Sequence, residues 1–121
     1  MLSPEAFARF LRPALASPGS PVEVRPGVTA VLQGRSLTFE HMYADPAKND
    51  GRASRFPESF GLSPAVLDDL RTRKNRKPLA NGTRTRVAGI MTALWAKRCH
   101  GEYPFRAIVA NPHRAEALVT A

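Results

Sequence analysis

Apolar residues near the start of the chain are spaced as in a helix. Residues 3–5 read Ser-Pro-Glu, a typical helix start, because a hydroxyl caps the first turn, proline suits its first position and a carboxylate faces the positive end of the helix dipole. Phe7, Phe10 and Leu11 then form a short apolar stripe. Pro13 limits the length of this predicted helix.

After the first helix the apolar period changes from helical to alternating. Apolar residues recur at every second position within 22–24, 28–32 and 37–39. Gly34 suits the first central position of a tight hairpin turn, where a positive φ is needed. We therefore expect a three-stranded antiparallel meander, which must pack against the first helix or a partner chain because so small a sheet is not stable alone. Residues 43–60 show little periodicity and are expected to form a long loop.

Two further helices are expected in the second half of the chain. Residues 63–74 repeat the serine-proline start and form the first of them. Thr83 is expected to cap the second, whose apolar residues fall at i, i+3, i+4 and i+7, namely Val87, Ile90, Met91 and Leu94. Residues 105–110 are expected as a strand, and a last short helix is expected from Asn111. The predicted fold class is α+β: a small N-terminal helix and a three-stranded meander, followed by a helical half.

The length of the chain sets its domain organisation. A chain of 121 residues with 43% hydrophobic content can bury one modest core. Residues 1–45 hold the first helix and the meander and are a candidate dimerisation element. Residues 46–121 hold the basic helical region, and the two parts are expected to be able to form one domain.

Positive charge is concentrated in the second half. Residues 1–60 contain seven Lys/Arg and six Asp/Glu, whereas residues 61–121 contain eleven Lys/Arg and four Asp/Glu. Within 71–86 there are seven positive charges and no acidic residue. A patch of this density repels itself unless a polyanion neutralises it, so it favours nucleic acid as the partner. The alternative that stays open is a solvated, arginine-rich surface.

Two short segments flank the basic stretch: Gly61-Leu62-Ser63-Pro64-Ala65-Val66 before it, and Thr83-Arg84-Thr85-Arg86-Val87 at the start of the next helix. With them, the segment from residue 61 to residue 95 resembles part of a helix-turn-helix repressor headpiece of the LacI-like or phage-repressor-like type. It implies that residues 63–74 enter the major groove of DNA. It also places a first helix at about residues 50–60, where Gly51 and Pro57 leave little room for one.

The candidate DNA-binding residues follow from the resemblance and the charge together. The resemblance implies that the start of the helix over 63–74 lies near base edges or phosphates, and that its basic end flanks the backbone. The N-terminus of the next helix would face a phosphate. The expected set is Ser63, Ala65, Arg71, Arg73, Lys74, Arg76, Lys77, Thr83, Arg84 and Arg86.

Catalytic and metal-binding patterns are weak in this sequence. Cys99 and the three histidines lack the paired spacing of a zinc site, and no glycine-rich phosphate loop or nucleophile elbow is present. Glu40 and His41 could serve as the acid and base of a small nuclease, but a strand-edge pair of this kind is usually solvated. We therefore expect no enzyme, no catalytic residues, no metal and no cofactor.

The cellular setting is read from the cysteine count and the N-terminus. The single Cys99 allows no internal disulfide, and the first fifteen residues lack the apolar run of a signal peptide or membrane span. A cytoplasmic protein without membrane contact is expected.

Two functions of different classes remain open from the sequence. The first is a sequence-specific DNA-binding transcriptional regulator of phage, plasmid or bacterial type, working as a homodimer on duplex DNA in preference to RNA. The second is a small interaction module or inhibitor that grips an acidic protein surface, with RNA binding as a variant of the first.

Overall fold

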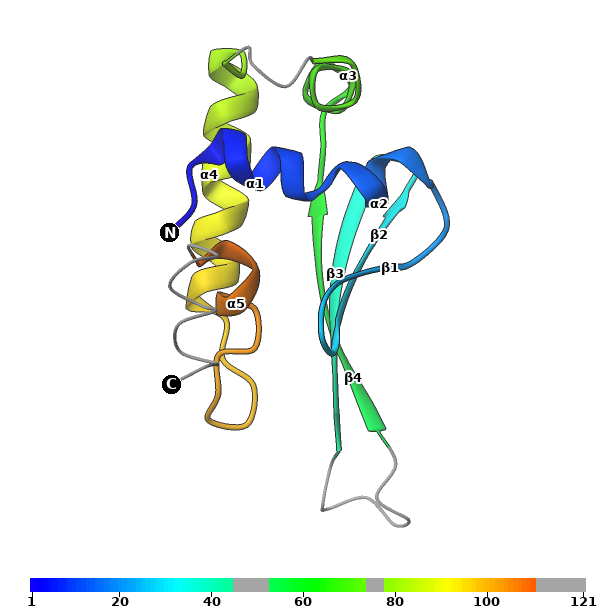
Figure 1. Ribbon diagram of the computed structural model, residues 1–121, viewed down its shortest axis with the longest axis vertical. Helices are drawn as coiled ribbons and strands as arrows, with labels where there is room; N and C mark the ends of the chain where they lie inside the picture. Colours follow the sequence, from blue (N-terminus) through cyan, green and yellow to red (C-terminus); the bar gives the residue numbers. More distant parts are fainter. Residues whose placement is uncertain (45–52, 74–77, 111–121) are drawn as a thin grey trace.

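The computed structural model describes residues 1–44, 53–73 and 78–110, and its fold is α+β as the sequence predicts (Figure 1). In chain order the elements are α1 (Pro4–Phe10), α2 (Arg12–Ala16), β1 (Val22–Arg25), β2 (Val28–Gln33), β3 (Ser36–Ala44), β4 (Ala53–Gly61), α3 (Pro64–Thr72), α4 (Asn81–Ala96) and α5 (Arg106–Val109). The strands form one antiparallel sheet in the order β1-β2-β3-β4. The expected meander is therefore present, but it is extended by a fourth strand.

The fourth strand corrects the prediction of a long loop over 43–60. Every residue of β4 pairs with β3, from Ala53 opposite Ala44 to Gly61 opposite Ser36. Phe56 and Phe60 alternate with exposed residues and pack against the core, so the period of two was present in the sequence. Pro57 does not interrupt the strand, because β4 is an edge strand, where one side of the backbone makes no ladder hydrogen bonds and a proline is tolerated.

β4 occupies the residues where the repressor resemblance implies a first helix before Gly61. Residues 53–60 are extended and paired with β3, so the expectation of a first helix at about 50–60 is wrong for this part of the chain. In the described structure α3 therefore follows a strand and is not the second helix of a helix-turn-helix.

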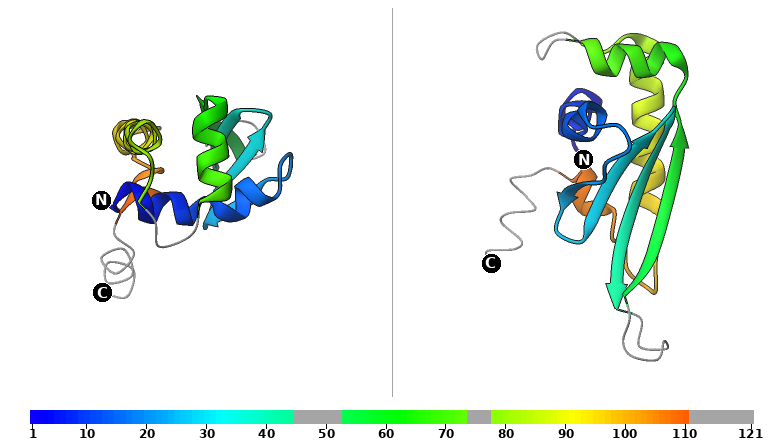
Figure 2. Two further views of the ribbon diagram at one scale, coloured as in Figure 1. Left: turned by 90° about the horizontal axis from the view of Figure 1, so that it is seen from above. Right: turned by 90° about the vertical axis from the view of Figure 1, so that its right-hand side faces the viewer.

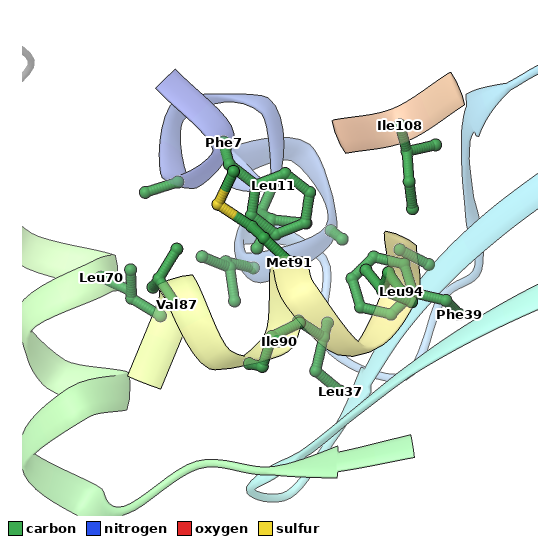
Figure 3. Close-up of a cluster of buried hydrophobic side chains, with 14 of the residues drawn as sticks. Phe7, Leu11, Leu37, Phe39, Leu70, Val87, Ile90, Met91, Leu94 and Ile108 are labelled. Atoms are coloured by element: carbon green, nitrogen blue, oxygen red, sulfur yellow. The ribbon is translucent and has the colours of Figure 1, made fainter. Parts of the chain in front are cut away.

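Helices cover one face of the sheet, and the core lies between them (Figure 2). Leu37 and Phe39 of β3 are fully buried on this face, whereas Thr38 and Glu40 alternate onto the other. The close-up in Figure 3 shows the side chains that meet these strand residues, including Phe7, Leu11, Val87, Ile90, Met91, Leu94 and Ile108. The cluster draws on residues from both 1–45 and 46–121, and β3 pairs with β4 across that boundary.

Local capping signals place the helix starts. The Ser3 and Ser63 hydroxyls accept hydrogen bonds from the backbone N–H groups of Ala6 and Val66, at 3.1 and 3.2 Å, as expected of N-caps. In contrast, α4 begins at Asn81, so Thr83 lies inside the helix and does not cap it. Residues 106–109 form α5 and not the expected strand, because a short apolar run suits either state and only packing decides between them.

Candidate nucleic-acid interface

A groove lined by three arginines lies where α2 and α3 pack together. The two helices cross as seen from above in Figure 2, and the groove between them encloses about 560 Å³. Its lining consists of Arg12, Leu15, Ala16, Leu70, Arg71, Thr72 and Arg73. This groove brings two of the predicted residues, Arg71 and Arg73, together with Arg12, which the sequence did not single out.

Arg12 is placed in the groove by a contact with the end of α3. Its Nη2 donates to the backbone carbonyl oxygen of Arg73, 61 positions later in the chain, at 3.1 Å. A guanidinium has five N–H donors, so this bond anchors the group and leaves other donors for a ligand. No local pattern links Arg12 to a residue that distant, and the neighbouring Pro13 was interpreted only as a limit to the first helix.

Arg71 is the exposed arginine of the groove. It lies in the last turn of α3, and within the described residues no hydrogen bond or ion pair engages its side chain. Its charge also complements the negative end of the α3 dipole, which is a structural reason for a basic residue at this position. Arg71 therefore offers a complete guanidinium fork to a ligand.

Arg73 is held by the protein itself. Its Nε forms an ion pair with the carboxylate of Asp69, one turn earlier, and its Nη1 donates to the carbonyl oxygen of Pro78 at 2.8 Å. The side chain stays 28% exposed, so it contributes to the field of the groove although two of its donors are used. Arg73 therefore mainly stabilises the end of α3 and offers few free donors to a ligand.

Asp69 is the acceptor that joins α3 to the start of α4. Burial works to raise the pKa of this carboxyl, but hydrogen bonds from Thr83, Arg73 and the backbone N–H of Ala80 hold the pKa below its ordinary value of 3.8. Thr83 is only 3% exposed, so its hydroxyl serves this internal contact. The prediction that Thr83 faces a phosphate is therefore wrong, because its side chain is buried against its own protein.

Two other predicted arginines connect elements of the fold. Arg84 forms an ion pair with Glu5 of α1, and this pair helps lower the pKa of the Glu5 carboxyl against the opposing effect of burial. Arg86 donates from Nε and Nη2 to the carbonyl oxygen of Gly61, at 3.0 and 2.8 Å. Both side chains are thus engaged away from the groove, so the basic residues of 71–86 that the structure describes do not form one continuous surface.

Ser63 and Ala65 lie on a different hollow, between α3 and the start of α4. This hollow has a volume of about 550 Å³ and is also lined by Asp68 and Asp69. Two carboxylates repel a phosphate, so the hollow is a poor site for a nucleic-acid backbone. The predicted residues Lys74, Arg76 and Lys77 lie outside the described residues.

The described part of the chain contains no group of three or more His, Cys, Asp or Glu side chains placed to hold a metal ion. None of its helices has the length and apolar character needed to cross a membrane. Comparison of the chain with protein-family models, curated proteins and solved structures finds no match.

Proposed function

We propose that this protein binds the sugar-phosphate backbone of nucleic acid, with duplex DNA as the first candidate, through the arginine-lined groove between α2 and α3. The observation that carries the proposal is the meeting of Arg12, Arg71 and Arg73, from two separate segments, along one groove. Guanidinium groups match phosphate oxygens in bidentate geometry, and several of them along one groove suit a polyanion better than a single small anion.

Charge and composition support the same partner. The chain carries a formal net charge of +8, and three further cations follow Arg73 directly in the sequence at positions 74, 76 and 77. Long-range attraction of this kind raises association rates with polyanions. The solvent side of α3 carries Asp68 as well as Arg71, and the Asp68 carboxylate repels phosphate. We therefore assign phosphate contact to Arg71 at the end of the helix and no base reading to α3. Sequence-specific recognition and a role in transcription stay predictions.

A salt titration tests the proposal. Binding of a labelled random duplex is measured by fluorescence anisotropy between 50 and 300 mM salt. Two phosphate contacts, through Arg12 and Arg71, give a slope of log affinity against log salt of about −1.8, roughly 0.9 per contact, and further contacts steepen it. Replacement of Arg71 by alanine should weaken binding and reduce the slope by about 0.9.

Arg55 provides the matched control. It lies on β4 opposite Met42, toward the end of the strand that is distant from α3, and its side chain is 67% exposed in an ion pair with Glu40. Arg55→Ala removes the same formal charge, so equal effects of the two variants would show that only net charge matters and would refute the groove. Absence of duplex binding at 50 mM salt would refute the proposal itself. Equal competition by polyglutamate would favour the alternative partner, an acidic protein surface.

A further inference from the structure

A second surface, rich in rings and cations, lies after the C-terminal end of α4. There the chain makes a tight turn in which Cys99 and Glu102 exchange two backbone hydrogen bonds, of 2.7 and 2.9 Å. His100 and Gly101 form its centre, with φ values of 49° and 86°. A histidine in the left-handed region is uncommon, so its ring is displayed here at some conformational cost.

The turn holds the His100 ring against the end of β3. His100 Nε2 and the Tyr43 hydroxyl lie 2.8 Å apart, and the two ring centroids are separated by 4.7 Å. Tyr43 in turn stacks on His41, with centroids 6.0 Å apart and an interplanar angle of 8°. Three rings from two distant segments therefore form one row, in which His100 is the exposed member.

Cations and rings also alternate along the segment from the end of α4 to the start of α5. The Arg106 guanidinium carbon lies 3.7 Å from the centroid of the Tyr103 ring and 4.8 Å from that of Trp95, and its Nε donates to the Trp95 carbonyl oxygen at 2.9 Å. Arg98, which is exposed, approaches Tyr103 at 5.8 Å. Tyr103 nevertheless remains 38% exposed, one of few large apolar side chains in the described chain to do so.

We propose that this surface, defined by His100, Tyr103 and Arg98, stacks unpaired bases of a single-stranded nucleic acid. Exposed rings and guanidinium planes are the groups on which bases stack regardless of sequence, and Arg98 supplies a cation for the adjacent phosphate. Arg106 and Arg98 both lie over the Tyr103 ring, so the base takes the part of the ring that these guanidinium groups leave exposed. Glu102 is exposed in the same turn and disfavours a dense phosphate backbone, which favours contact through bases over contact with a duplex.

The inference goes beyond the proposed function, because it adds a second surface for single strands to the groove proposed for duplex DNA. The ring surface is separate from the groove: α3 and the turn after α4 lie toward opposite ends of the long axis of the molecule (Figure 1). The 16 residues of α4, which run between them, span about 24 Å. Substitutions at the two surfaces are therefore expected to act independently.

The experiment compares two single strands of equal charge. One is a 20-nucleotide oligothymidylate and the other is a strand of the same length made of abasic sites. The unmodified protein should prefer the strand that carries bases. Tyr103→Leu should reduce affinity for that strand about 5- to 140-fold and remove the preference, whereas Tyr103→Phe should retain it because the ring remains.

Two further variants, which are expected to fold, distinguish loss of base stacking from loss of structure. His100→Asn preserves the left-handed turn, because asparagine tolerates that conformation, and removes one ring; it should lower the preference for bases. Met42→Leu alters an exposed apolar side chain on β3 whose register position faces away from the core, and it should change nothing. Far-ultraviolet circular dichroism confirms that each variant is folded.

Equal binding of the two strands by the unmodified protein would overturn this inference, as would a folded Tyr103→Leu variant with an unchanged preference. If duplex binding still depends on Arg71, the proposed function survives that result. Absence of binding to duplex and to both single strands at low salt would overturn both.

Discussion

Replacement of Thr83 by valine separates a structural role from a DNA-contact role at one position. The sequence placed Thr83 among the DNA-binding residues, whereas the structure buries it to 3% exposure and bonds its hydroxyl to Asp69. Valine has nearly the same shape and branching, so the substitution removes the hydroxyl without opening a cavity. The result is therefore a loss of stability, with no direct loss of binding.

The magnitude follows from the partner of the hydroxyl. A hydrogen bond to a charged group contributes about 1.5–3 kcal/mol to stability. Asp69 keeps two other donors, Arg73 and the backbone N–H of Ala80, so we expect the lower part of that range, about 1.5–2 kcal/mol. For a chain of this size the melting temperature should fall by roughly 6–8 °C, at about 4 °C per kcal/mol.

Urea unfolding, followed by the fluorescence of the single Trp95, measures the change in the free energy of unfolding. Thr92→Val is the matched control. Thr92 is an exposed threonine on the same helix whose hydroxyl donates only to the Ala88 carbonyl oxygen, at 3.0 Å, so its replacement should change stability by less than about 0.5 kcal/mol. Equal effects of the two variants would refute the assigned contact. So would a Thr83→Val protein that keeps its stability but loses affinity for the duplex.

Four other outcomes follow from the same contacts. The folded-state pKa of Asp69 is lowered, so the stabilising effect of its carboxylate is present above about pH 4 and is lost as the pH falls through the lowered value. Urea titrations from pH 6 to pH 2 should therefore show a smaller acid-induced loss of stability in Asp69→Asn than in the unmodified protein. Arg84→Ala should cost less than about 1 kcal/mol by thermal denaturation, since Arg84 is 50% exposed and its ion pair is screened by solvent. Arg86→Ala should cost about 1 kcal/mol in urea unfolding through the lost hydrogen bonds to Gly61, and Arg86→Lys should not restore the bidentate contact. Phe39→Ala, at a fully buried ring between Phe7 and Phe60, should cost about 3–5 kcal/mol by the same measurement, and a loss below 1 kcal/mol would contradict the described core.

The arginines show why closeness in sequence did not predict a common surface. Four arginines of the described structure lie within sixteen positions but have different surroundings. Arg71 lines the groove, Arg73 pairs with Asp69, Arg84 pairs with Glu5, and Arg86 donates to the Gly61 carbonyl oxygen. An arginine side chain is long and has donors on several sides, so its partner depends on which segments packing brings within reach. The same reach explains how Arg12 enters the groove from the other end of the chain.

Local signals in the sequence determined the parts of this protein that depend on neighbouring residues alone. They include the two serine-proline helix starts, the hairpin turn at Gly34, whose φ is 61°, the alternation of β2 and β3, and the apolar stripe of α4. Each of these follows from interactions within about one helical turn or one strand pair, so the amino-acid pattern is sufficient to specify it.

Only the tertiary structure decided the fourth strand, the helical state of 106–109 and the composition of both candidate surfaces. β4 exists because β3 offers it a partner along its whole length, which outweighs the proline in its middle. The ring surface exists because β3 and the turn after α4 lie side by side. These features depend on contacts between segments distant in sequence, and such contacts become favourable only once the hydrophobic core has brought the segments together.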